Sequence, residues 1–101
     1  MARRRTLSHD LNDRLGFRRS VIVLRYVWLW ALFREVEKRD PHNIDEFADA
    51  FEVDRSAVYR WQQSLREAYE DADSPAWVLD RIEQRRRAGT LRQFGTARMV
   101  T

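Results

Sequence analysis

The chain contains no cysteine, and only three glycines and two prolines among its 101 residues. The absence of cysteine excludes a disulfide framework, a zinc–thiolate site and a thiol nucleophile. It also fits a reducing cytosol, so we expect a cytoplasmic protein. Glycine and proline together are too few for the many turns of an all-β chain. We therefore predict one all-α domain, a small bundle of about five helices.

Motifs for catalysis and metal binding are also missing. The sequence has no glycine-rich phosphate loop, no GxSxG and no HExxH, which are the patterns that would indicate nucleotide, serine-hydrolase or metalloprotease chemistry. Its two histidines, His9 and His42, lie far apart in the sequence, and a metal site needs at least a third convergent ligand. We expect both to be surface histidines, and we predict neither an enzyme nor a bound metal or cofactor.

Lysine is nearly absent. Of the nineteen basic residues, Lys38 is the single lysine and the other eighteen are arginine. The net charge of +3 is unevenly spread. Residues 1–39 carry ten basic and four acidic residues, residues 40–73 carry three and ten, and residues 74–101 carry six and two. Basic ends therefore flank an acidic middle. The basic N-terminal arm, residues 1–6, contains Arg3, Arg4 and Arg5, which could lie along phosphates or enter a minor groove; a solvated, disordered tail is the equal alternative.

One long apolar run is present, residues 21–33, in which twelve of thirteen residues are apolar. At about 1.5 Å per residue a helix of this length spans about 20 Å, which is short of a bilayer core of about 30 Å, so we expect no membrane span. Two interpretations remain. The helix is either a central core helix, covered on every side, or it contributes a homodimer face through Tyr26, Trp28, Trp30 or Phe33.

Shorter patterns place the remaining helices. Leu7, Leu11 and Leu15 indicate a short first helix, with Ser8 as a possible cap and Gly16 as its stop. Asp40-Pro41 ends the apolar helix, and Ser74-Pro75 begins the last one. Gly89 is a plausible end of that helix. The tail, residues 90–101, shows no clear period; packing on a neighbour, folding on a partner and fraying as a flexible tail all stay open.

The segment from residue 43 to 69 is predicted to form two short helices joined by a tight turn. Asn43 is a good N-cap, with Glu46 three residues later to answer it. Asp54 caps a second helix that runs from Arg55 to about Tyr69. Two helices separated by three residues cannot lie antiparallel, so we expect them to cross steeply.

The second of these helices divides into two faces at about 100° per residue. The packing face is apolar and the outer face is polar and basic. The packing face comprises Val58, Trp61, Leu65, Ala68 and Tyr69, and the outer face comprises Arg55, Ser56, Tyr59, Arg60, Gln63 and Arg66.

In these residues the segment resembles the helix-turn-helix family of DNA-binding proteins, over roughly Ile44 to Gln63. Ala48 stands where the family favours a small residue, and Val53 matches the apolar residue after the turn. Four further residues match the family's core positions: Phe47, Phe51, Val58 and Trp61. The family favours glycine in the turn for its positive φ, at the position of Glu52 here, and another residue there costs about 1 kcal/mol of backbone strain.

The resemblance implies a small bacterial or phage regulator that binds double-stranded DNA, with the helix from Arg55 in the major groove. The expected readers of base edges are Ser56, Tyr59, Arg60 and Gln63, with Arg55 and Arg66 flanking toward phosphate. The acidic middle of the chain motivates an alternative, a protein-binding module of an accessory or inhibitory factor. A third possibility is the DNA-recognition subunit of a phage or mobile-element assembly.

Overall fold

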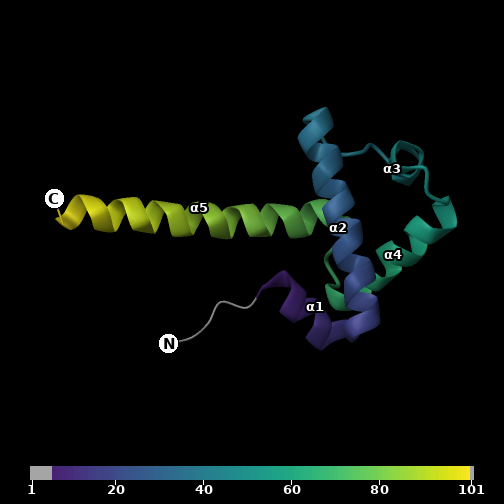
Figure 1. The fold of residues 1–101 in the computed structure, drawn as a ribbon, viewed down its shortest axis with the longest axis horizontal. Helices are drawn as coiled ribbons and strands as arrows, with labels where there is room; N and C mark the ends of the chain where they lie inside the picture. Colours follow the sequence, from purple (N-terminus) through teal and green to yellow (C-terminus); the bar gives the residue numbers. More distant parts are fainter. Residues whose placement is uncertain (1–5, 101) are drawn as a thin grey trace.

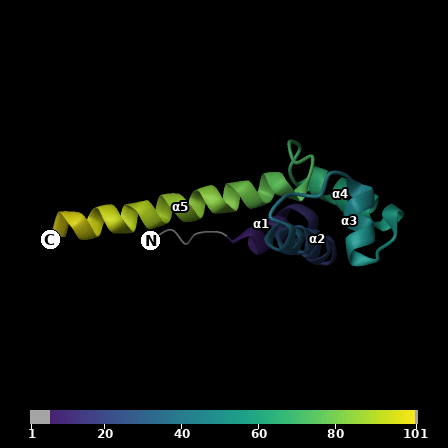
Figure 2. The ribbon, with the colours of Figure 1, turned by 90° about the horizontal axis from the view of Figure 1, so that it is seen from above.

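The computed structural model describes residues 6–100, and the side chains of residues 6–88. This part of the chain forms five helices and no strand: α1 (Leu7–Leu15), α2 (Phe17–Glu37), α3 (Ile44–Phe51), α4 (Arg55–Ala68) and α5 (Pro75–Val100). The predicted all-α fold of about five helices is confirmed. Helices α1, α3 and α4 lie around α2, and most of α5 extends away from them (Figures 1 and 2). No helix in the described range is long and apolar enough to cross a membrane.

Helix α1 begins and ends at polar caps. Its N-cap is Thr6, whose hydroxyl oxygen accepts a hydrogen bond from the His9 amide at 3.2 Å. The expected cap, Ser8, lies inside the helix instead, because the cap position falls one residue before Leu7. Gly16 ends α1 with φ at +82° and passes the chain directly into α2. A left-handed φ suits glycine, which has no Cβ.

Helix α2 is longer than the apolar run at its centre. It begins at Phe17, four residues before that run, and ends at Glu37, a few residues before Asp40-Pro41. Lys38 follows in the left-handed conformation with φ at +59°, and its amide donates to the Arg34 carbonyl. The helix therefore closes on its own backbone before the proline is reached.

One face of α2 is the centre of the fold. This helix contacts each of the other four, and its residues Val23, Tyr26, Val27, Trp30 and Phe33 are buried. The opposite face is open, with Trp28 at 75 % exposure. The expectation that α2 is covered on every side was wrong, because its four neighbours pack against only one side of it.

This arrangement also corrects the proposed dimer residues. Tyr26, Trp30 and Phe33 lie in the core of the same chain and cannot form a homodimer face. Of the four residues suggested from the sequence, only Trp28 is available to a partner.

An aromatic cluster joins α2 to α3 and α4. The Phe47 ring of α3 lies 5.3 Å from the ring of Tyr26 and 5.4 Å from that of Trp30, centroid to centroid. Trp61 of α4 contacts Tyr26 at 5.8 Å. Buried aromatic pairs of this kind contribute about 0.5–1.5 kcal/mol each beyond their apolar area. The cluster therefore positions α3 and α4 relative to α2.

Arg34 fixes the connection that follows α2. Its guanidinium donates to both carboxylate oxygens of Asp40, at 2.8 and 3.1 Å, and to Asp80 of α5 at 3.0 Å. The Trp30 indole also donates to Asp40, at 2.9 Å. These hydrogen bonds, led by that from Arg34, lower the pKa of Asp40. One arginine thus links α2, the loop before α3 and α5.

The last helix begins as predicted and continues beyond its expected end. Pro75 is its first residue, where proline loses no hydrogen bond. Gly89, expected as a stop, lies within α5, which is helical to Val100. A single glycine inside a helix costs only about 1 kcal/mol relative to alanine. The side chains of the tail lie outside the described residues.

Replacing Phe47 with alanine should lower the free energy of unfolding by about 3–5 kcal/mol, because it empties the centre of the aromatic cluster. Urea denaturation followed by tryptophan fluorescence measures this change. Tyr59→Ala, at a site that is 55 % exposed, should change the same quantity by no more than about 0.5 kcal/mol. Equal effects of the two substitutions would contradict the described core.

Candidate nucleic-acid interface

Helix α3 begins at the predicted cap. The Asn43 side-chain oxygen accepts a hydrogen bond from the Glu46 amide at 2.9 Å. Glu46 answers one residue earlier than a capping box requires, because its carboxylate accepts from the His42 amide at 2.7 Å rather than from Asn43. The start of α3 is therefore held from both sides.

The Glu46 carboxylate is also bound by Arg39, through two hydrogen bonds of 2.8 and 2.7 Å. The Arg39 hydrogen bond, followed by that from the His42 amide, lowers the pKa of Glu46 to about 2. This bidentate pair connects the end of α2 to the first turn of α3. The sequence offers no signal for it, since the two residues are seven apart in an irregular segment.

The turn after α3 contains a left-handed residue, and the sequence places Glu52 there rather than glycine. Glu52 adopts a left-handed conformation, with φ at +53° and ψ at +42°. Its amide donates to the Asp49 carbonyl at 3.3 Å, and the Val53 amide donates to the Ala48 carbonyl at 3.0 Å. This pair of bonds is a Schellman motif, which usually places glycine at the left-handed position.

Asp54 is the N-cap of α4, and its carboxylate accepts a hydrogen bond from the Ser56 amide at 3.3 Å. Figure 1 shows α3 almost end-on and α4 running obliquely beside it, so the two helices cross instead of lying side by side. The predicted packing face of α4 is confirmed. Val58, Leu65 and Ala68 are buried, and Trp61 and Tyr69 are partly buried against the core.

The opposite side of α4 is open to solvent. We call it the α4 outer face; it comprises the six residues predicted as a DNA-contacting set, all of them exposed: Arg55, Ser56, Tyr59, Arg60, Gln63 and Arg66. The side chains of Tyr59, Arg60 and Gln63 make no hydrogen bond or ion pair with any other described residue. Three adjacent polar groups at the middle of the face are therefore free to bind.

Two arginines of the face are already paired. The Arg55 Nε atom lies 2.9 Å from Asp45 of α3, and an Arg66 Nη atom lies 3.1 Å from Asp73. Acidic residues of the middle segment fold back beside these arginines, and their contact with phosphate stays a prediction. All four side chains are at least half exposed, and such pairs contribute about 0–1 kcal/mol.

The C-terminal half of α4 is held in place by α2 and by the loop before α5. Arg19 of α2 forms an ion pair with Glu67 and a hydrogen bond of 3.3 Å to the Ser64 hydroxyl. The Gln62 side-chain amide donates to the Asp73 carbonyl at 2.7 Å. These contacts fix this part of α4 against α2 and the following loop, while its outer face stays exposed. Arg3, Arg4 and Arg5 of the basic arm lie outside the described residues.

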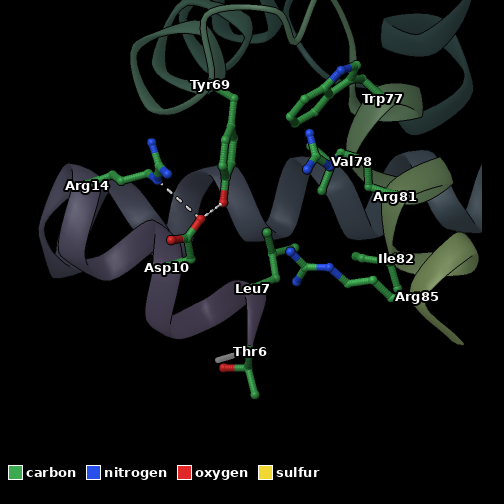
Figure 3. Close-up of a pocket in the computed structure, with 10 residues that line it drawn as sticks. All are labelled: Thr6, Leu7, Asp10, Arg14, Tyr69, Trp77, Val78, Arg81, Ile82 and Arg85. Atoms are coloured by element: carbon green, nitrogen blue, oxygen red, sulfur yellow. Dashed lines mark hydrogen bonds and ion pairs between the residues drawn. The ribbon is translucent and has the colours of Figure 1, made fainter. Parts of the chain in front are cut away.

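A second concave site escaped the sequence-based predictions. A pocket with a volume of about 300 Å³ lies between α1 and α5, and Figure 3 shows the side chains that line it. The Tyr69 hydroxyl donates to Asp10, and an Arg14 Nη atom donates to the Ala68 carbonyl at 3.0 Å. Its lining residues are Thr6, Leu7, Asp10, Arg14, Tyr69, Trp77, Val78, Arg81, Ile82 and Arg85.

The polar groups deep in this pocket are satisfied by one another. Burial, and then the hydrogen bond to Asp10, raise the pKa of Tyr69 to about 12, so its hydroxyl stays protonated at neutral pH. Arg81 lies over the Trp77 ring, 4.7 Å from its centroid. The bonds from Tyr69 to Asp10 and from Arg14 to the Ala68 carbonyl therefore join α1 to the C-terminal end of α4. No sequence pattern predicts the pocket, because its residues come from three separate segments.

His9 and His42 are both exposed, and the described residues contain no group of three potential ligands that could hold a metal ion. Comparisons with protein-family models, with curated protein sequences and with solved structures found no match. The fold and the α4 outer face are therefore interpreted from their own geometry and chemistry.

Replacing Glu52 with glycine should raise the free energy of unfolding by up to about 1 kcal/mol, because glycine adopts the left-handed conformation without strain. Chemical denaturation measures the gain. Glu83→Gly, inside α5, provides the matched control and should lower stability by about 1 kcal/mol. If both substitutions lower the free energy of unfolding, the left-handed conformation of Glu52 is contradicted.

The bond between Arg39 and Glu46 predicts a pH-dependent contribution to stability. Because the folded-state pKa of Glu46 is lowered to about 2 from its ordinary value of 4.5, its contribution is complete above pH 4.5 and disappears as the pH falls toward 2. The melting-temperature difference between the wild type and Glu46→Gln should therefore shrink over this interval. Arg39→Gln removes the other partner of the same bond, so its melting-temperature difference from the wild type should shrink over the same interval.

Proposed function

We propose that the protein binds double-stranded DNA through the α4 outer face, as a small transcriptional regulator. One observation carries this proposal: Tyr59, Arg60 and Gln63 project from a rigidly held helix and lack any partner among the described residues. A face whose polar groups are unsatisfied within the chain, on a helix held by an aromatic core, suits an external partner that offers donors and acceptors.

The side chains of the face match the chemistry of base edges in the major groove. Arginine donates two hydrogen bonds to guanine O6 and N7, and glutamine can pair with adenine N6 and N7. Arg60 and Gln63 are three residues apart in α4, so they lie on neighbouring turns of one side. Tyr59 and Ser56 can reach either a base or a phosphate.

Phosphate binding requires the paired arginines to exchange partners. Arg55 and Arg66 can leave their aspartates at small cost, because both ion pairs are exposed to solvent. Each of these ion pairs is a single contact, whereas a DNA phosphate can accept two hydrogen bonds from one guanidinium and also releases counterions on binding. We therefore expect Arg55 and Arg66 to contribute affinity without sequence preference.

Binding to a randomised pool of duplex DNA, followed by measurement on the selected sequence, tests the proposal. Arg60→Ala and Gln63→Ala should each weaken binding by about 1–3 kcal/mol, which is roughly a 5- to 150-fold rise in Kd, and should relax preference at one base position. Gln84→Ala, at an exposed site on α5, is the control for Gln63→Ala and should leave Kd unchanged. If both α4 variants keep the wild-type affinity and base preference, Arg60 and Gln63 do not read DNA and the proposal is refuted.

A second candidate follows from the paired arginines. Asp45 and Asp73 oppose two of the three cations of the face, which suits a protein-binding module that docks a basic partner surface. The salt dependence separates the two candidates. A DNA reader binds duplex strongly at low salt and loses affinity steeply as salt rises, whereas this module should not bind duplex even at about 50 mM salt.

A further inference from the structure

Helix α2 carries a second apolar face on the side away from the core. We call it the α2 stripe, and it consists of Phe17, Val21, Trp28, Leu32 and Val36. These residues are 77, 49, 75, 52 and 68 % exposed. At about 100° per residue they fall within an arc of about 100°, and the stripe is about 28 Å long.

The stripe is as large as the largest apolar patches of typical monomers, and patches of that size are often functional. With side-chain areas on the order of 150–250 Å² for its aromatic residues and less for the aliphatic ones, the exposed fractions leave roughly 600 Å² of apolar area. The largest apolar patch on a typical monomer is about 300–600 Å², and a stable interface buries about 800 Å² on each partner. The stripe and its rim supply the area that one standard interface needs.

We propose that a second copy of this chain covers the α2 stripe, with the two α2 helices packed antiparallel about a twofold axis. In this arrangement the stripes overlap about their common midpoint. Phe17 of one copy then lies beside Val36 of the other, and Val21 beside Leu32. The two largest exposed side chains that face each other near the axis are the two Trp28 residues. Phe17, Val21, Leu32 and Val36 each meet an apolar partner, and Trp28, which is level with Arg25 of the other copy, lies about 4.5 Å along the helix from the other Trp28, in a closed, isologous contact.

The charges beside the stripe select the antiparallel direction. Arg18 borders its N-terminal half. Arg25 lies within the arc, between Val21 and Trp28, with its guanidinium 5.6 Å from the centre of the Trp61 ring of α4. Glu35 borders the C-terminal end, where Lys38 lies 3.6 Å away. A parallel pair would place Arg18 beside Arg18, Arg25 beside Arg25 and Glu35 beside Glu35. The antiparallel pair brings Arg18 to the level of Glu35 on the other copy, so each end of the contact holds charges of both signs.

Analytical ultracentrifugation of the full chain without DNA tests the interface. The wild type should sediment as a dimer that dissociates on dilution. Trp28→Glu should raise its dissociation constant by at least about 30-fold, because it places a charge in the centre of the contact. Tyr59→Glu makes a similar change at an exposed aromatic residue outside the stripe and should keep the wild-type constant.

Circular dichroism confirms that each variant retains its helices, which keeps the result from reflecting unfolding. A wild-type chain that is monomeric up to high micromolar concentration would overturn the proposal, as would a dimer that Trp28→Glu leaves intact. In the first case the stripe would belong to a different partner. None of these outcomes depends on DNA binding, so the proposal stands or fails independently of the proposed function.

Cross-linking tests the direction of the helices, and the absence of native cysteine makes it clean. In the antiparallel pair the cysteine of Val21→Cys lies beside the cysteine of Leu32→Cys on the other copy. Two copies of the same variant keep their cysteines about 16 Å apart along the helices, too far for a disulfide. A mixture of the two variants should therefore form a disulfide-linked dimer under mild oxidation, whereas each variant alone should not. Efficient cross-linking of Val21→Cys to itself would establish a parallel pair and overturn the proposed orientation.

Discussion

The contact of Phe47 with Tyr26 and Trp30 is the interaction on which the arrangement of the other elements depends. Phe47 lies on an eight-residue helix, and a helix of this length is not stable alone in water. Its ring becomes fully buried between two aromatic residues of α2. Because the turn between α3 and α4 is only three residues long, fixing α3 on α2 also fixes where α4 begins. The orientation of the α4 outer face is thus a consequence of core packing on α2.

The small size of the domain explains why α2 has two apolar faces with different fates. The four other helices of the described chain, of which α5 mostly extends away, cover only one side of α2 (Figure 2). The core side carries Tyr26 and Trp30, and the open side carries Phe17 and Trp28. A chain that retains large aromatic residues on an open helix face loses solubility unless another surface covers them. The stripe and the α4 outer face are thus separate surfaces, one apolar and one polar.

Acidic residues have a structural role in this protein that its net charge conceals. Asp40 and Glu46 are held by arginines of α2 and of the loop that follows it, and both pKa values are lowered by those bonds. Asp45 and Asp73 stand beside two arginines of α4. The acidic middle of the chain is therefore used largely to fix loops and helix ends, and it moderates the positive charge of the α4 outer face without closing access to Arg60.

Local patterns were sufficient for what depends on neighbours in the sequence. The caps at Asn43 and Asp54, the stop at Gly16 and the division of α4 into two faces were predicted correctly, since each depends on residues within one or two helical turns. Spacing could not show which side of α2 is buried, because that run is apolar in all directions and only the positions of α1, α3, α4 and α5 distinguish its sides. Nor could it show that Arg55 and Arg66 have acidic partners. Ion pairs such as Arg66 with Asp73 join different segments, and their formation depends on where the folded backbone places them.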